Sequence, residues 1–245
     1  MKKRNIAFFD IDKTIYDGYL IFPLAEYFLD ENIITRDIID SLDRGLYLYR
    51  SKQMDYESTV ENFNKDFARG LKGYPPDLLI CKTLTFLKNM KLKNFFSFAE
   101  PLMKLLGKTH DIYFVTGEVQ FVGKAVAEHF SVQGYISSEI EIKDGLFNGN
   151  ITKSLARKEE KSAAIEMLFN AYPKEKSMAF GDSEGDIDML DKVIHAFCIN
   201  ATERLMEVAL TKGWHIVTSF SILEEVKKIL QSKSCESENK ISTCE

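Results

Sequence analysis

The apolar run at residues 6–9, Ile-Ala-Phe-Phe, is followed at once by two carboxylates, Asp10 and Asp12. Such a run predicts a buried strand, and a buried strand accommodates two carboxylates only where its end opens into a site. In a parallel α/β sheet, ligands bind at the carboxyl ends of the strands. The two carboxylates repel each other and any phosphate, and a divalent cation such as Mg²⁺, which prefers oxygen ligands, removes both conflicts. The stretch therefore predicts a metal site that serves phosphoryl transfer through an aspartyl-phosphate.

A calcium-binding loop is the main alternative for this stretch. An EF-hand loop needs glycine at its sixth position and glutamate at its twelfth. Counted from Asp10, those positions hold Ile15 and Ile21. The sequence therefore argues against an EF-hand.

Composition limits the classes of protein to which the chain can belong. Its 245 residues, 45% of them hydrophobic, suffice for one domain or for a core domain with an insert. The net charge of −5 comes from both signs spread along the chain, so neither nucleic acid nor an anionic membrane is an expected partner. No apolar run is long enough for a membrane span or a signal peptide, which favours a cytoplasmic protein. The sequence does not indicate the oligomeric state.

The four cysteines, Cys81, Cys198, Cys235 and Cys244, have no metal-ligand spacing. Cys81 and Cys198 stand among apolar residues, so both are expected to be buried thiols.

The order of predicted elements indicates a doubly wound parallel sheet with an insert after its first strand. Between residues 16 and 92 the patterns are helical only, with helices expected at 20–32, 35–49, 55–69 and 77–89. Strands then alternate with helices, which is typical of a parallel α/β sheet. Strands are expected at 111–115, 177–180, 196–199 and 215–217, with a hairpin at 138–152. Helices are expected at 97–106, 120–130, 158–171, 186–191, 201–212 and 221–231.

The predicted division follows from this order. Residues 1–15 and 93–231 form the α/β core, residues 16–92 form a helical cap, and residues 232–245, rich in Ser, Lys, Glu and Asn, form a disordered tail.

Polar residues follow two later strands of the predicted core. Thr116 and Gly117 end one strand before a helix, where a hydroxyl and free N–H groups can hold phosphate. An ordinary helix N-cap is the alternative for Thr116. Asp182 and Asp186, in Gly-Asp-Ser-Glu-Gly-Asp, end the other strand and suit a metal-binding loop. The alternative is a solvated acidic loop.

A fixed positive charge is also needed beside the transferred phosphoryl group. Lys161, on the helix before the strand at 177–180, is the candidate, and Lys158, one turn earlier, competes with it.

These pieces together resemble the haloacid dehalogenase superfamily, whose four motifs occur in the same order. The motifs are Asp10-x-Asp12-x-Thr14, then Thr116-Gly117, then Lys161, then Gly181-Asp182-x-x-x-Asp186. The helical insert between the first two motifs resembles the cap of the phosphoserine-phosphatase-like subgroup. The resemblance covers nearly the whole chain and implies a Rossmann-like α/β core with this cap.

The resemblance also implies roles for the motif residues. Asp10 would be the nucleophile that carries the aspartyl-phosphate, and Asp12 the general acid and base. Mg²⁺ would be held by the Asp10 carboxylate, the Asp12 main-chain carbonyl and Asp182. Phosphate would be held by Thr116, Gly117 and Lys161, while Asp186 and Thr14 would support the metal site from outside its ligands. The implied activity is Mg²⁺-dependent hydrolysis of a small-molecule phosphomonoester.

The resemblance does not extend to the residues that recognise phosphoserine. Phosphoserine phosphatases have a glutamate where this chain has Tyr19, and a cap arginine where it has Phe63. Arg50 and Arg69 are the possible substitutes for that arginine. Aromatic residues of the insert, Tyr16, Tyr19, Phe22 and Phe63, suggest a less polar or ring-bearing leaving group, although core packing is the better explanation for any one of them.

Two other functions use the same residues. A phosphotransferase or phosphomutase would pass the phosphoryl group from the aspartyl-phosphate to a second alcohol. A phospho-accepting signalling domain also combines an acidic cluster, a Thr or Ser and a Lys, but the helical insert and the second acidic loop argue against it.

Overall fold

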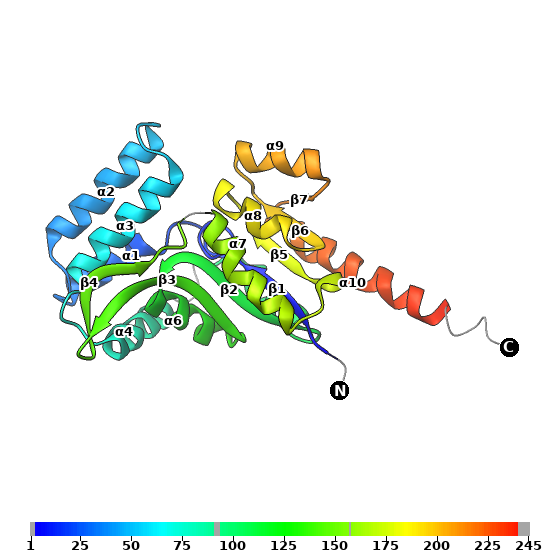
Figure 1. Cartoon of the computed structure of the whole chain (residues 1–245), viewed down its shortest axis with the longest axis horizontal. Coiled ribbons are helices and arrows are strands. Elements are labelled where there is room, and N and C mark those ends of the chain that lie inside the picture. Colours follow the sequence, from blue (N-terminus) through cyan, green and yellow to red (C-terminus); the bar gives the residue numbers. More distant parts are fainter. Residues whose placement is uncertain (1–2, 91–93, 157, 240–245) are drawn as a thin grey trace.

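The molecule is built around a seven-stranded sheet with the strand order β4-β3-β2-β1-β5-β6-β7 (Figure 1). This computed structural model describes residues 3–90, 94–156 and 158–239. All neighbouring strands are parallel except β3 and β4. The strands are β1 Asn5–Phe9, β2 His110–Val119, β3 Gly134–Lys143, β4 Leu146–Lys153, β5 Met178–Gly181, β6 His195–Ile199 and β7 His215–Val217.

Helices cover both faces of the sheet, so the predicted doubly wound α/β fold is confirmed. Ala7 and Phe9 of β1 belong to a core shared with α5, α6 and α10, whereas Ile6 and Phe8 face a second core with α7, α8 and α9. The helices are α1 Ile21–Asp30, α2 Arg36–Arg50, α3 Tyr56–Gly70, α4 Pro76–Asn89, α5 Ala99–Leu106, α6 Gln120–Phe130, α7 Lys158–Glu166, α8 Ile187–Asp191, α9 Glu203–Lys212 and α10 Ile222–Asn239. Short 3-10 turns are η1 Met167–Asn170, η2 Lys174–Lys176 and η3 Glu184–Asp186.

The strand order places a topological switch point between β1 and β5. From β1 the chain builds β2 and β3 on one side, and it then returns to build β5, β6 and β7 on the other. Neighbouring connections diverge at such a point, and the crevice between them is where open α/β sheets bind ligands. The residues that follow β1 and β5 therefore lie at the position where a site is expected.

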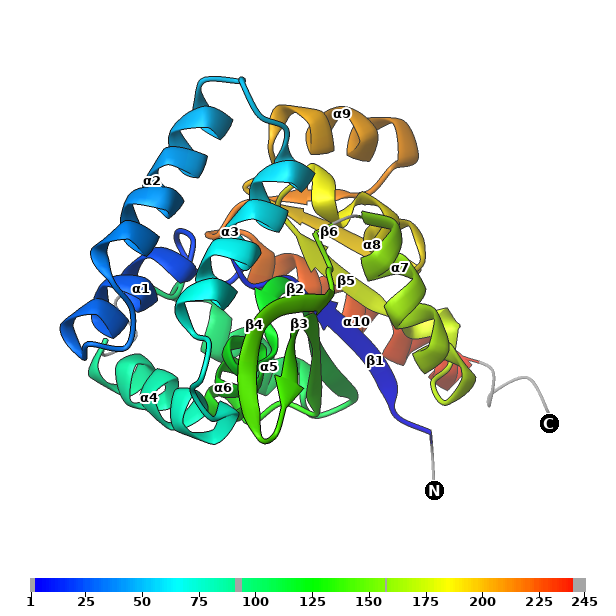
Figure 2. The same cartoon turned by 60° about the vertical axis from the view of Figure 1, so that its left-hand side comes forward.

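The helices α1–α4 occupy the range predicted for a cap, and Figure 2 shows them (blue to cyan) along one side of the molecule. The chain leaves and re-enters the core through two segments that pair with each other. Asp17 N donates to Asn94 O at 2.7 Å, and Phe96 N donates to Ile15 O at 2.9 Å. This pairing supports a division near residues 15 and 93, which remains a prediction.

Two parts of the structure join the insert to the core. Helix α4 packs against α6, and the β3–β4 hairpin curves toward α3 (Figure 1). Phe147 on β4 exchanges backbone hydrogen bonds with the turn after α3: Gly73 N donates to Phe147 O at 2.7 Å, and Phe147 N donates to Tyr74 O at 3.0 Å. The hairpin thus contacts the helical insert at the turn after α3.

Four sequence predictions need correction. Cys81 is exposed, because the buried stripe of α4 runs through Leu79, Thr83, Phe86 and Leu87, whereas Cys198 is buried as predicted. The predicted disordered tail begins too early, because α10 continues to Asn239 through a stretch with no Gly or Pro to end it. Residues 240–245 lie outside the described part.

The third correction concerns the helix expected at 158–171. Helix α7 ends at Glu166, and the 3-10 turn η1 follows. Strand β2 also continues four residues beyond its predicted end at Val115, to Val119, which matters for the site.

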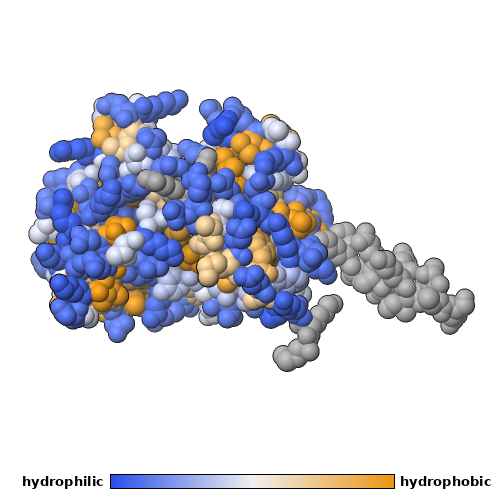
Figure 3. Space-filling view, in the orientation of Figure 1, coloured by the Kyte–Doolittle hydropathy of each residue, from blue (hydrophilic) through white to orange (hydrophobic). Residues whose placement is uncertain are grey.

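The outer surface offers little apolar area on the face drawn in Figure 3, where hydrophobic residues form small groups among hydrophilic ones. Within the described residues, no helix combines the length and apolar character that a membrane crossing requires.

Candidate active site

The first carboxylate of the site is fixed by the two strands that flank β1. Phe9, the last residue of β1, pairs with Phe114 of β2 and with Phe180 of β5. The next residue, Asp10, donates its backbone N–H to Phe180 O at 3.0 Å. Asp10 thus continues the ladder toward β5, and the residue is buried at the switch point with 6% exposure.

Lys161 enters the same space from α7, on the other side of the switch point. Its Nζ donates to Asp10 Oδ1 at 2.7 Å and to Asp186 Oδ1 at 2.8 Å, and the side chain is only 1% exposed. A buried lysine is stable only when it is paired, and here it is paired with two carboxylates. Of the two lysines that the sequence proposed, Lys161 lies in the site, and the side chain of Lys158 is outside the described part.

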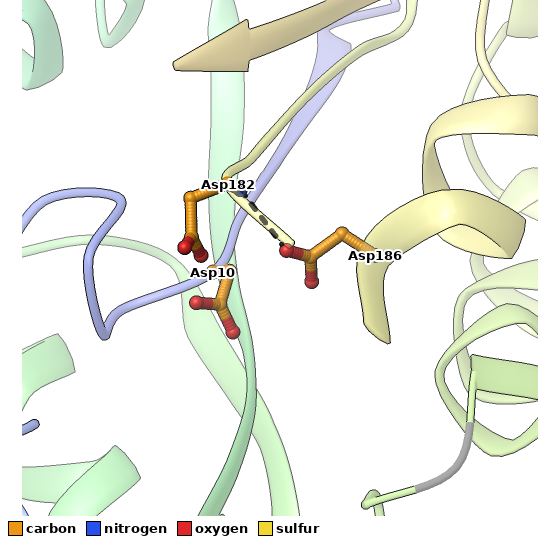
Figure 4. A group of neighbouring side chains, drawn as sticks. All are labelled: Asp10, Asp182 and Asp186. Carbon is orange, nitrogen blue, oxygen red and sulfur yellow. Dashed lines mark hydrogen bonds between the residues drawn. The ribbon is translucent and has the colours of Figure 1, made fainter. Parts of the chain in front are cut away.

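The loop after β5 is organised by Asp186. Its Oδ2 accepts a hydrogen bond from the backbone N–H group of Asp182 at 3.1 Å (Figure 4). The backbone N–H group of Ser183 donates to the same oxygen at 3.3 Å. A Cβ at Gly181 would lie 2.5 Å from Asp186 Cβ, so only glycine permits this approach. Both oxygens of Asp186 therefore already accept hydrogen bonds from the protein. The supporting role predicted for Asp186 remains a prediction.

The carboxylates of Asp10, Asp182 and Asp186 come together as a buried group, with one oxygen from each within 4.8 Å of the others. Thr14 links the first motif to this group by donating from Oγ1 to Asp182 Oδ1 at 3.4 Å. Three carboxylates and one lysine leave the cluster with excess negative charge, and every atom that could bind a metal there is an oxygen. This set fits a hard divalent cation. Asp10 and Asp182 accept fewer side-chain hydrogen bonds than Asp186, so their carboxylates are the freest to bind it.

Asp12 stands apart from that cluster and turns toward the insert. Its Oδ1 accepts the backbone N–H of Leu20 at 2.8 Å. Lys13, between the two aspartates, has a left-handed backbone with φ of 59°, and its Nζ lies 5.5 Å from the centre of the Tyr19 ring. The tight turn after Asp10 thus directs the two aspartate side chains to different parts of the site.

Burial and mutual repulsion shift the pKa values of these groups. Burial, opposed in part by Lys161, raises the pKa of Asp10 to about 7. Burial also raises the pKa of Asp12 to about 6 and that of Asp182 well above its usual range, with the Asp186 and Asp10 charges adding to the shift at Asp182. Burial disfavours the charged form of Lys161, but the Asp10 and Asp186 carboxylates outweigh burial and raise the pKa of Lys161. The site therefore holds acids that can exchange protons near neutral pH.

Thr116 and Gly117 lie on the neighbouring strand β2. Thr116 is 1% exposed, and its Oγ1 accepts the backbone N–H of Glu118 at 3.1 Å. It is not the N-cap of α6, because Val119 occupies that position. Gly117 lines the cleft above the aspartates, so its location fits the predicted contact with phosphate, which remains a prediction.

Asn64 of α3, which the sequence reading missed, joins the insert to this strand. Its Nδ2 donates to Gly117 O at 2.8 Å and lies 3.2 Å from Ser138 Oγ, and the residue is 3% exposed. Ser138 Oγ also donates to Gly117 O at 2.8 Å. The sequence signal that could have identified it is an asparagine beside Phe63 and Phe67, on the apolar face of α3.

Glu118 is the second residue that the sequence reading missed. It is 5% exposed, and its carboxyl lies within hydrogen-bond reach of the Asp12 carboxyl. Burial, with the neighbouring Asp12 charge, raises the pKa of Glu118 well above its usual range. The sequence signal was a glutamate directly after Thr116-Gly117, inside a segment that is otherwise apolar.

A cleft of about 740 Å³, part of it open to solvent, lies between the aspartates and the insert. Tyr19 and Phe63 line this cleft, while Tyr16 is buried against Phe95 and Phe22 packs on Phe63 behind the cleft wall. The cleft is lined by Asp10, Asp12, Lys13, Tyr19, Ile21, Leu46, Tyr49, Tyr56, Thr59, Val60, Phe63, Asn64, Gly117, Glu118, Asp182, Ser183 and Thr202.

The two arginines proposed to replace the missing cap arginine do not line the cleft. Arg69 forms surface ion pairs with Asp37 and Asp66 and is 59% exposed. Arg50 borders a separate groove beside Tyr49 and Glu184.

Comparison with known proteins places the chain in one family. The sequence model of the haloacid dehalogenase-like hydrolase family matches residues 7–191, which include all four motifs. The chain belongs to this family, as the sequence predicted, and this membership favours an enzyme over a signalling domain.

Relatives and solved structures agree with this placement. A Mycobacterium tuberculosis protein named "Probable phosphatase Rv3661" is 25% identical over 227 residues, which cover 90% of this chain and 77% of that protein. A Bordetella pertussis protein of unknown function has a TM-score of 0.74 at 20% identity, over 89% of this chain and 100% of the other. A phosphoserine phosphatase solved as a phospho-aspartyl intermediate analogue has a TM-score of 0.65 at 18% identity, over 93% and 99%. The last two likenesses are of fold.

Proposed function

We propose that this protein is a Mg²⁺-dependent phosphatase that hydrolyses a small-molecule phosphomonoester through an aspartyl-phosphate at Asp10. The observation that carries the proposal is the buried cluster of Asp10, Asp182 and Asp186, in which Lys161 pairs with Asp10 and Asp186. Asp12 lines the cleft beside this cluster. The match to the hydrolase family and the phosphatase-named relative support it.

The reaction follows from the positions of the two aspartates. A carboxylate oxygen of Asp10 attacks phosphorus, and the bond from phosphorus to the leaving oxygen breaks as Asp12 gives that oxygen a proton. Asp12 then takes a proton from water, whose oxygen attacks phosphorus and releases phosphate from Asp10. A group that first donates and then accepts a proton works best with a pKa near the working pH, and the pKa of Asp12 is raised to about 6.

The remaining residues hold charge during these steps. Lys161, whose Nζ lies 2.7 Å from Asp10 Oδ1, would bind an oxygen of the transferred group, together with Thr116 and the Gly117 N–H. Asp10, Asp182 and the Asp12 carbonyl would hold Mg²⁺, which when bound neutralises charge on the phosphoryl oxygens. Asp186 keeps Lys161 and the loop in place through its own hydrogen bonds.

The test is phosphate release from 4-nitrophenyl phosphate, measured with Mg²⁺ and with EDTA. The wild type should release phosphate only with Mg²⁺, and Asp10→Asn should lower kcat by at least about a thousandfold, because it removes the nucleophile. Asp144→Asn, an exposed change in the β3–β4 turn, is the matched control and should keep the activity. Turnover preserved in Asp10→Asn would refute this mechanism.

The same assay separates hydrolysis from phosphotransfer. A transferase or mutase with the same Asp10 intermediate would release less phosphate when an acceptor alcohol is added, and would form a new phosphomonoester. The phosphatase proposal predicts phosphate release that equals substrate consumed, with or without the acceptor.

A further inference from the structure

The helical insert forms one wall of the cleft, and this wall carries no charge. None of the described insert residues that line the cleft is acidic or basic. The charged lining residues come instead from the strand ends and loops of the core. The insert wall consists of Tyr19, Ile21, Leu46, Tyr49, Tyr56, Thr59, Val60, Phe63 and Asn64.

The polar side chains of the insert wall are engaged within the protein or stay uncharged. Asn64 Nδ2 donates to Gly117 O at 2.8 Å, and Thr59 Oγ1 donates to Asp55 O at 2.6 Å. Burial raises the pKa of the three phenols in the wall, so they are neutral at neutral pH. A charged leaving group placed against this wall would lose its water and gain no countercharge.

The charged groups on the core side of the cleft are also engaged. The carboxyls of Glu118 and Asp12 lie within hydrogen-bond reach of each other. Lys13 Nζ lies 5.5 Å from the centre of the Tyr19 ring. Burial raises the pKa of Asp12, and the positive charge of Lys13 opposes that shift, so the two charges attract each other. The other two lining carboxylates are those proposed to hold Mg²⁺.

The apolar members of the insert wall lie close to the proposed phosphate position. A Cβ at Gly117 would lie 3.1 Å from Val60 Cγ1, so this methyl group packs directly on the glycine proposed to bind phosphate. A Cβ at Gly45 would lie 2.8 Å from Phe63 Cε1. Glycine weakens a helix interior, but here it lets α2 approach the Phe63 ring that lines the cleft. Apolar surface therefore begins beside the phosphoryl group.

We infer that the insert wall selects phosphomonoesters whose leaving group is uncharged and apolar, with Leu46, Val60 and Phe63 as specificity-determining residues. The inference rests on the proposed phosphatase function and names its substrate class: alkyl or aryl phosphates without a charged group on the alcohol. The leaving oxygen lies at Asp12, and the carbon chain extends from there along the insert wall. Removal of that chain from water favours binding.

The test measures kcat/KM for straight-chain alkyl phosphates from ethyl to hexyl phosphate, whose leaving alcohols have nearly equal acidity. For the wild type, kcat/KM should rise about two- to fourfold with each methylene, because each one is buried against the wall. Hexyl phosphate should therefore exceed ethyl phosphate by about 15- to 250-fold.

Charged chains of similar length complete the series. Pentyl phosphate should exceed both 4-aminobutyl phosphate and 4-carboxybutyl phosphate in kcat/KM by at least about tenfold. The reason is that an ammonium or carboxylate group at the end of the chain would be buried without a partner.

A polar substitution in the insert wall should flatten the alkyl series. Leu46→Asn replaces an apolar side chain by an amide of similar size, and the hexyl-to-ethyl ratio should fall at least about fivefold. An effect on the common chemical step would change both substrates and cancel in the ratio. Tyr47→Asn is the matched control on the same helix: Tyr47 is 64% exposed and outside the lining, so the ratio should be kept.

The outcomes separate this inference from the proposed function. A flat alkyl series, or faster hydrolysis of either charged chain, with 4-nitrophenyl phosphate still hydrolysed, overturns the inference and leaves the phosphatase proposal intact. A steep series that Leu46→Asn leaves unchanged overturns the assignment of selectivity to the insert wall. If that variant does not fold, Val60→Thr, which keeps the side-chain shape, replaces it, and an unchanged ratio again overturns the assignment. No hydrolysis of any substrate overturns the proposed function and this inference with it.

Discussion

Replacing Asp182 with asparagine should stabilise the metal-free protein and remove its stabilisation by Mg²⁺. Asp182 is 7% exposed, and its carboxylate accepts one side-chain hydrogen bond from the described residues, that of the Thr14 hydroxyl at 3.4 Å. Asp10 and Asp186 lie beside it, and Lys161 donates to those two residues. The negative charge of Asp182 is therefore unfavourable for folding of the metal-free protein. A cation bound by Asp182 would offset this repulsion.

The size of the effect follows from the distances in the cluster. Two carboxylate oxygens 4.8 Å apart repel by about 3.5 kcal/mol at an effective dielectric constant of about 20. The attraction of Lys161 offsets part of the two repulsions, and local relaxation removes more. We expect the free energy of unfolding of the metal-free variant to exceed that of the wild type by about 1–3 kcal/mol at pH 8.

The direction of the pH dependence follows from the raised pKa of Asp182. Because the folded-state pKa lies above the ordinary value of 3.8, the penalty is absent when the group is protonated in both states. It grows as the pH rises above 3.8 and is complete above the folded-state pKa. The advantage of Asp182→Asn should thus be small at pH 4 and largest at alkaline pH.

The assay is urea unfolding of wild type, Asp182→Asn and the control Asp144→Asn, each with EDTA and with Mg²⁺. At a Mg²⁺ concentration one hundred times its Kd, the wild type and the control should gain about 2.7 kcal/mol, and Asp182→Asn should gain little. A metal-free variant that is less stable than the wild type at pH 8, or that gains as much from Mg²⁺, would refute the reasoning.

Three other substitutions test separate contacts of the site. Gly181→Ala places a Cβ 2.5 Å from Asp186 Cβ, so urea unfolding should show a loss of about 1–3 kcal/mol. Asn64→Ala removes its hydrogen bond to Gly117 O at 2.8 Å and should lower the free energy of unfolding by about 1–3 kcal/mol; an unchanged value would show that this contact does not hold the insert. Lys161→Met should lower kcat by at least about a hundredfold, and near-normal kcat would exclude its role at the phosphoryl group.

The sequence could predict the parts of the site that follow directly from strand ends. Asp10 and Asp182 come just after buried strands, and the rules of parallel sheets bring such residues together without knowledge of side-chain contacts. The doubly wound sheet and the helical insert followed from the switch between alternating and purely helical patterns. The helix at 120–130 was predicted with the bounds that the structure gives.

The residues that the sequence missed depend on contacts between distant segments. Glu118 becomes buried because β2 continues to Val119, while the apolar pattern appeared to end at Val115. Asn64 can join the insert to the core only because α3 crosses Gly117 and Ser138. Propensity along the chain carries no information about such crossings. The burial predicted for Cys81 was wrong for a related reason, since local apolar context does not specify which face of α4 is buried.

Covalent trapping of the phosphoryl group on Asp10 tests the central proposal most directly. The enzyme is quenched in acid during steady-state turnover with Mg²⁺ and substrate, reduced with borohydride, which converts an aspartyl-phosphate to homoserine, and mapped by peptide mass spectrometry. The mechanism predicts homoserine at position 10 that requires both substrate and Mg²⁺. Phosphate release with Asp10 unmodified, or reduction at Asp12 or Asp182 instead, would contradict it.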